Sequence, residues 1–191
     1  LVELLVFGRR SGEAASAHSK SLRAQLREKR VIDAAHDDLD SLIREGEEVA
    51  RPLQRALRNT MWELCGVVRD EERMREGLDK LVELSVTAAK VDVRPTSEGH
   101  IDLALALDLR GSLAAAEATL RSAIERAESR GAHQRSDYPE PSTEPVISVV
   151  VGRDESGDQV VSARSVPPMP GGLAEWVKME EDLTIADRLL E

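Results

Sequence analysis

The residues of this sequence with most capacity for chemistry gather in one short polar segment, residues 129–139 (SRGAHQRSDYP). Arg130, His133, Arg135 and Asp137 all lie there, directly after the apolar pattern of a long helix. Cations at this point can stabilise a helix by donating hydrogen bonds to its last carbonyl groups. The same cluster can equally form a polar seam that docks onto another domain. The residue types support both interpretations.

Metal-binding patterns are weak elsewhere in the chain. The chain contains no CxxC pair. Its four histidines lack the spacing of a zinc site; they are His18, His36, His100 and His133. Residues 154–158 (DESGD) resemble the first half of a calcium loop. However, Gln159 replaces the glycine that the loop requires, and Ser165 stands where the closing glutamate belongs. We therefore expect a polar hairpin tip at this segment.

Nucleophilic and phosphate-binding chemistry has little support as well. Cys65 falls within the apolar pattern of a helix, where a free cysteine usually acts as a small buried hydrophobic residue. The sequence contains neither GxGxxG nor GxxxxGK[ST], the motifs whose backbone amides hold phosphate groups. We therefore expect no self-sufficient active site in this chain.

The composition limits the classes of protein further. The 191 residues correspond to one domain, or to a domain with appendages. A net charge of −10 argues against a general nucleic-acid or anionic-membrane binder. The single cysteine excludes an intrachain disulfide framework, and no apolar stretch reaches the roughly 18 residues of a membrane helix. Because only four residues are aromatic, the core must consist mainly of Leu, Ala and Val.

Four stretches show apolar residues at three- and four-residue steps, which predicts helices. They cover residues 1–30, residues 47–68, a stretch from Asp70 to at least Ala88, and residues 101–129. The last three are amphipathic and closely connected, so they can bury their apolar faces only against each other. We expect a mainly α fold based on an antiparallel, spectrin-repeat-like three-helix bundle.

The chain changes in character after the third of these bundle helices. Residues 146–151 and 159–166 are rich in β-branched residues and flank a polar, glycine-containing segment, which predicts a β-hairpin. Residues 167–172 are expected to form a linker, and residues 173–191 a short terminal helix. These patterns predict three parts: residues 1–46 (a helix and a charged connector), 47–139 (the bundle) and 140–191 (the hairpin and tail).

Three segments, in order, resemble succinate dehydrogenase and fumarate reductase flavoprotein subunits. Residues 6–15 (VFGRRSGEAA) resemble the helix that closes the flavin domain of that family. Residues 61–69 (MWELCGVVR) and 126–139 (RAESRGAHQRSDYP) resemble two segments of its C-terminal domain. L-aspartate oxidase shares much of this pattern and is the nearest alternative family.

The resemblance implies that the chain is a C-terminal fragment of an FAD-dependent enzyme that interconverts succinate and fumarate and passes electrons to an iron–sulfur subunit. It assigns residues 1–46 to the last flavin-domain helix and its connector. It implies a flavin contact at Leu1 and docking of Arg130, His133 and Arg135 against the flavin domain. It also implies no nucleic-acid partner, contact with a membrane only through partner subunits, and a place on the cytoplasmic face of the inner membrane.

Two features depart from the family and leave room for an atypical or aspartate-oxidase-like member. Residues 33–48 are longer and more acidic than the family pattern, and residues 140–145 replace its usual stretch after Pro139. The charge also reverses sign between the basic residues 20–30 and this acidic stretch. That reversal supports the alternative of a stand-alone helical interaction module. Under either hypothesis, we expect the chain alone to be catalytically inactive.

Overall fold

A computed structural model of the chain describes residues 2–22, 28–44, 47–97, 99–100 and 102–173. The chain divides into two compact units, residues 1–45 and residues 46–191. The mainly α fold with a small antiparallel hairpin, expected from the sequence, is confirmed.

The described residues of the first unit form two helices, α1 (Val2–Ser21) and α2 (Lys29–Asp40), so the prediction of one helix over residues 1–30 was wrong. The Ser21 hydroxyl donates a hydrogen bond to the carbonyl of His18, and the Leu22 amide bonds the carbonyl of Ser19. Such three-residue bonds compete with continued α-helix. Glu28 then adopts an extended conformation before α2 begins.

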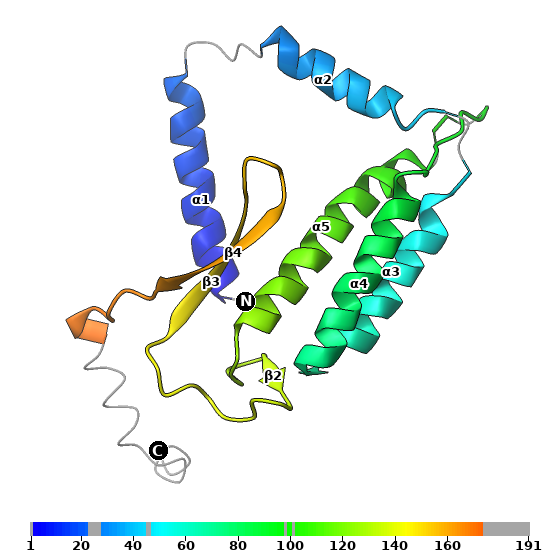
Figure 1. Cartoon of the computed structure of the whole chain (residues 1–191). Helices are drawn as coiled ribbons and strands as arrows, with labels where there is room; N and C mark the ends of the chain where they lie inside the picture. The colour runs from blue at the N-terminus through cyan, green and yellow to red at the C-terminus, as the bar shows by residue number, and fades with distance from the viewer. Residues whose placement is uncertain (1, 23–27, 45–46, 98, 101, 174–191) are drawn as a thin grey trace. The chain divides into compact units, whose positions relative to one another are not determined.

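The second unit contains α3 (Ala50–Leu64), α4 (Glu71–Ala88) and α5 (Leu103–Glu125), each of which packs against the other two (Figure 1). Pro52 lies in the first turn of α3, where a proline is tolerated because its missing N–H has no partner in the helix. Asp70 caps α4, since its carboxylate accepts a hydrogen bond from the Arg73 amide at 2.9 Å. The antiparallel, spectrin-repeat-like course of the three helices stays a prediction.

The core between these helices consists of aliphatic side chains and one methionine. Met74 of α4 and Leu120 of α5 are completely buried. Gly77 lets α4 approach α5 closely, because a Cβ atom at this position would lie 3.1 Å from a methyl carbon of Leu120. Other buried members of the core are Leu57, Leu64, Leu81, Leu109, Ala116 and Ala123.

Two small sheets complete this unit. The predicted hairpin consists of β3 (Ile147–Arg153) and β4 (Gln159–Ser165), and the Gln159 side chain anchors it by donating to the carbonyl of Ala114 in α5 at 2.8 Å. At its tip, a carboxylate oxygen of Asp154 accepts hydrogen bonds from two backbone amides, as expected for a polar turn. The other pair is parallel and was not predicted: β1 (Val68–Arg69) and β2 (Gln134–Arg135).

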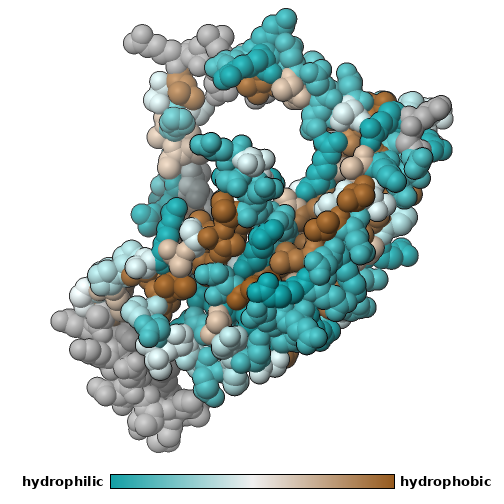
Figure 2. Space-filling model, in the orientation of Figure 1, coloured by the Kyte–Doolittle hydropathy of each residue, from teal (hydrophilic) through white to brown (hydrophobic). Residues whose placement is uncertain are grey.

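The surfaces of α4 and α5 differ in polarity. In the view of Figure 2, hydrophilic side chains cover α4, whereas hydrophobic atoms follow α5 as a stripe. The terminal helix expected over residues 173–191 falls, beyond Leu173, outside the described residues.

Candidate functional site

The polar segment after α5 is organised around Arg135, whose side chain is completely buried. Its guanidinium forms a two-point pair with Asp137, with Nε to Oδ1 at 2.7 Å and Nη2 to Oδ2 at 2.6 Å. The remaining nitrogen, Nη1, donates to the carbonyls of Ala123 and Ile124 at 3.0 and 3.2 Å. These carbonyls belong to the last turn of α5 and have no helical partner of their own. Arg135 therefore caps α5, as one of the two sequence interpretations proposed.

Asp137 extends this network from the end of α5 to the beginning of α4. Its Oδ2 accepts a hydrogen bond from the Glu71 amide at 2.9 Å, in the first turn of α4. The Arg135 guanidinium, together with that amide, lowers the pKa of the Asp137 carboxyl, whereas Asp137 raises the pKa of Arg135. A carboxylate is thus held between an arginine and a helix N-terminus, both of which stabilise negative charge.

His133 is held in one tautomer by its two partners. Nδ1 lies 2.9 Å from Nη1 of Arg69, and Nε2 lies 3.0 Å from the carbonyl oxygen of Arg126. Because an arginine can only donate and a carbonyl can only accept, Nδ1 must be the acceptor and Nε2 must carry the proton. Burial, followed by the charges of Arg69, Arg135 and Arg126, lowers the pKa of His133. The imidazole is therefore neutral in this arrangement.

Glu128 connects two arginines to the segment that follows. Its carboxylate pairs with Arg126 at 2.6 Å and with Arg130 at 2.9 Å, and it accepts a hydrogen bond from the Ser142 amide at 2.9 Å. The Ser142 amide is the main cause that lowers the pKa of Glu128 to about 2, and the two arginines add to it. Arg130 reaches this carboxylate from a tight turn in which Gly131 has a positive φ of 59°.

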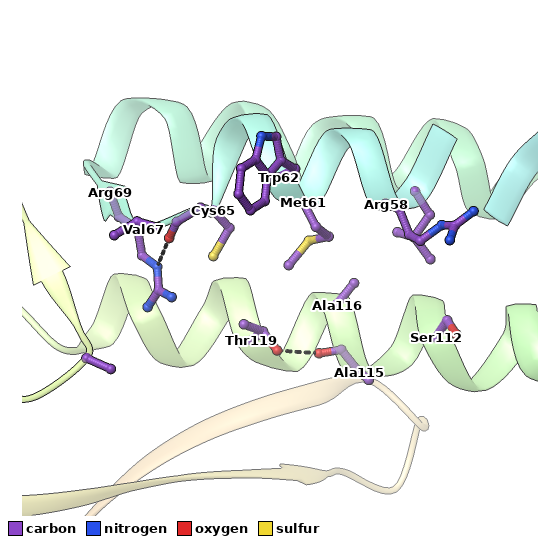
Figure 3. A pocket seen from close by; sticks show the side chains of 13 residues that line it. Arg58, Met61, Trp62, Cys65, Val67, Arg69, Ser112, Ala115, Ala116 and Thr119 are labelled. Carbon is purple, nitrogen blue, oxygen red and sulfur yellow. Dashed lines mark hydrogen bonds between the residues drawn. The ribbon is translucent and has the colours of Figure 1, made fainter. Parts of the chain in front are cut away.

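Beside this network, an apolar groove of about 840 Å³ runs between α3 and α5 (Figure 3). One side carries larger residues of α3, whereas the facing side of α5 carries small ones, Ala115, Ala116 and Thr119. Trp62 lines the groove with 75% of its surface exposed. Cys65 is buried at its edge, and this burial raises the pKa of the thiol, which makes it a poor nucleophile.

The structure places the residues singled out in the sequence in different environments. Arg135 lies in the interior, His133 is half-buried, and the Arg130 side chain retains 37% of its exposed surface. Leu1 lies outside the described residues. Sequence reasoning missed the parts played by Arg69 and Glu128. A signal for both was present, because each lies within a segment that carries the family resemblance.

This arrangement of charged groups stabilises the structure of the segment. The charged groups of the segment pair with each other or with backbone groups over the described residues. Within the same residues, no group of three His, Cys, Asp or Glu side chains could hold a metal ion. Across the described helices, none combines the length and apolar character needed to cross a membrane.

Comparison with known proteins assigns this architecture. The family model described as fumarate reductase flavoprotein C-term matches residues 54–178, which include most of α3, all of α4 and α5, the arginine network and the hairpin. The chain belongs to this family. The match agrees with the resemblance found in the sequence.

Individual members of the fumarate reductase flavoprotein family support the assignment. The chain is 34% identical over 146 residues to the fumarate reductase flavoprotein subunit of Haemophilus influenzae, covering 73% of this chain and 24% of the relative. It is 31% identical over 170 residues to the corresponding subunit of Mycobacterium tuberculosis, covering 82% and 29%. The chain thus spans about a quarter of the length of these relatives.

Solved structures show the same fold. The Mycobacterium smegmatis Sdh1 complex in the apo form matches with a TM-score of 0.75 at 30% identity, covering 95% of this chain and 32% of that one. A quinol–fumarate reductase with menaquinol molecules matches with a TM-score of 0.75 at 30% identity, covering 87% and 30%. An adenylylsulfate reductase from Archaeoglobus fulgidus, 18% identical with a TM-score of 0.69, shares the fold alone.

Proposed function

We propose that this chain is the C-terminal helical domain of an FAD-dependent succinate dehydrogenase or fumarate reductase flavoprotein subunit, and that it supports the enzyme without catalysing the reaction itself. The family match over residues 54–178 carries this proposal. The complete protein would interconvert succinate and fumarate and pass electrons to an iron–sulfur subunit. FAD would supply the redox chemistry, while protein residues bind and orient the reactants.

The described residues do not themselves fit an FAD site. Dinucleotide phosphates usually bind where a glycine-rich turn leads from a strand into a helix. The positive-φ glycines of the described chain are Gly99, Gly131 and Gly157, and each lies in a turn of another kind. Arg135, whose side chain is completely buried, is already paired with Asp137 and the end of α5. We therefore assign most of the flavin site to other parts of the protein, with Leu1 as the proposed contact from this chain.

The proposed supporting role has a structural rationale in the arginine network. Arg135 and Asp137 join the end of α5 to the start of α4, and this junction holds the neighbouring turn. Arg130 and His133 lie on that turn and are only partly buried, so they can contact the flavin domain. Arg135 would then act as a positioning residue for the same interface. The boundaries near residues 46 and 139 remain our proposed limits of the bundle domain.

The proposed partners follow from the same family. Two of the solved relatives are described as a Sdh1 complex and a quinol–fumarate reductase. By analogy, we propose that this chain packs on the flavin domain of its own protein and belongs to an assembly with an iron–sulfur subunit. Membrane contact would come only through partner subunits, on the cytoplasmic face of the inner membrane.

The test compares the 191-residue chain with the longest product of the gene that encodes it. We expect the chain alone to show no flavin absorbance and no succinate-dependent dye reduction, and the longer product to show both. Aspartate-dependent activity in the longer product would favour L-aspartate oxidase instead. Turnover above background by the purified 191-residue chain would refute the supporting role.

A further inference from the structure

The groove between α3 and α5 leaves apolar surface uncovered in the second unit. Trp62 and Val67 line it with 75% and 69% of their surfaces exposed. Because α5 contributes only small side chains here, α3 and α5 cannot fill the space between them (Figure 3). Exposed apolar surface of this kind is typical of a site that another segment covers.

The charge around the groove is of one sign. Arg58 and Arg69 line it, and no acidic residue does. The chain as a whole carries a charge of −10, whereas the charged residues that line this groove are these two arginines. A segment that fits it should therefore present an apolar stripe together with acidic residues.

The sequence contains such a segment at its C-terminal end. Over residues 174–191, which lie outside the described part of the chain, apolar residues recur at steps of three, four, three and four: Trp176, Met179, Leu183, Ala186 and Leu190. This spacing predicts a single apolar stripe on a helix. The segment contains six acidic and two basic residues, so its charge is opposite to that of the groove.

The connection is long enough to bring this segment to the groove. Ser165 ends β4 and pairs with Ile147, whose carbonyl accepts a hydrogen bond from Arg126 at the end of α5. Thr119 of the groove lies seven residues before Arg126, about 10 Å along the helix axis. The eight residues from 166 to 173 can span up to about 26 Å when extended.

We propose that residues 174–191 dock as an amphipathic helix in the groove between α3 and α5, with the stripe from Trp176 to Leu190 against Trp62 and the acidic face toward Arg58 and Arg69. The docked segment would form a fourth helix of the bundle and cover the apolar face that Trp62 exposes. The interaction is intramolecular, so a modest affinity is sufficient because the short connection supplies a high effective concentration.

The only two tryptophans of the chain provide a direct test, since one lies in the groove and the other in the tail. In Trp176→Phe, Trp62 is the only tryptophan and the apolar stripe is kept. The same tryptophan is the only one in a chain that ends at Gly172. We expect Trp62 to emit at shorter wavelength in Trp176→Phe than in the shortened chain. Its quenching by acrylamide should also be weaker, by about twofold or more, as a mainly docked population requires.

A matched pair of variants separates the stripe from the rest of the tail. In the Trp176→Phe background, Leu183→Asp places a charge on the stripe and should restore the quenching seen in the shortened chain. Thr184→Asp adds the same charge one residue away, off the stripe, and should leave Trp62 protected. Because Leu183→Asp removes no residue, it also serves if the shortened chain does not fold.

Alkylation of the single cysteine gives a second measurement. Cys65 lies at the edge of the groove, so the docked tail should slow its reaction with a maleimide relative to Leu183→Asp. Equal quenching and equal alkylation with and without the tail would overturn the proposal. Protection of Trp62 that appears only as protein concentration rises would also overturn it, because the occupant would then be a second copy of the chain.

Discussion

At the scale of single residues, Arg135 is buried, and all three nitrogens of its guanidinium form hydrogen bonds within the protein. Asp137 takes two of the nitrogens and the end of α5 takes the third, while the Tyr138 ring lies 4.9 Å from the guanidinium carbon. An ion pair whose arginine is buried adds little net stability compared with apolar residues, but it is costly to break, because the buried groups around the arginine lose their partner. Its value lies in the fixed geometry of the turn that follows α5.

Replacing Arg135 should therefore destabilise the second unit strongly. We expect Arg135→Ala to lower the free energy of unfolding by about 3–5 kcal/mol, because Asp137 is left without its partner and α5 loses its cap. Arg135→Lys should recover only part of this, since an ammonium cannot form the two-point pair. The measurement is urea unfolding followed by circular dichroism.

The matched control is Arg9→Ala, which removes an ion pair with Glu13 on the exposed surface of α1. It should change the free energy of unfolding by less than about 0.5 kcal/mol. If Arg135→Ala were as mild as Arg9→Ala, the central place of Arg135 in the network would be wrong.

His133 should make stability depend on pH. Its pKa is lowered in the folded chain, so the unfolded chain binds more protons just below the unfolded pKa of about 6.5. The stability present above pH 6.5 is therefore lost as the pH falls toward the folded pKa. His133→Gln, which cannot titrate, should lack this component when free energies of unfolding are measured between pH 5 and 7.5.

His18→Gln provides the comparison, because His18 lies exposed on α1. This variant should keep the pH dependence of the unaltered chain. A pH dependence of His133→Gln identical to that of His18→Gln would mean that His133 is not held in the neutral form.

At the scale of elements, periodicity predicted the three bundle helices because each buries one stripe of its own local sequence. On α4, for example, Met74 and Leu81 belong to such a stripe, and both are buried. The long helix expected over residues 1–30 was wrong, since local serine bonds and an extended Glu28 interrupt it. The pairing of β1 with β2 could not be predicted, because two-residue strands far apart in the chain carry no periodic signal.

The packing of α4 on α5 gives a prediction for the core. Leu120→Ala should lower the free energy of unfolding by about 2–5 kcal/mol, because a completely buried side chain leaves a cavity that close-packed neighbours fill only partly. Thermal and urea unfolding both measure this change. Val82→Ala on the exposed side of α4 should stay within about 0.5 kcal/mol, and a similar effect of the two variants would contradict the assigned core.

At the scale of the whole molecule, the two units differ in what stabilises them. Neither α1 nor α2 contains a buried residue, whereas α3, α4 and α5 each contain at least three. Helices without a packed face rely on local propensity and are marginal in water. In the proposed complete protein, the exposed apolar residues near the start of α1 would pack within the flavin domain.

This difference predicts that α1 can be removed without lowering the stability of the bundle. Deletion of residues 1–22 should leave the unfolding free energy of the remaining chain within about 0.5 kcal/mol of the original value, because α1 buries none of its side chains. Limited trypsin digestion should likewise cut first at the exposed arginines and lysines of α1 and α2. A large loss of stability on deletion would show that α1 supports the second unit.

The sequence by itself determined the class of fold, the hairpin and the family. These features follow from local periodicity, turn chemistry and short motifs, which need no knowledge of distant contacts. Only the tertiary structure decided what the polar segment does within this chain, because it brings Asp137 to the start of α4 and places Arg135 at the end of α5. The same three-dimensional packing opens the groove beside Trp62, since space between two helices depends on which side chains face each other.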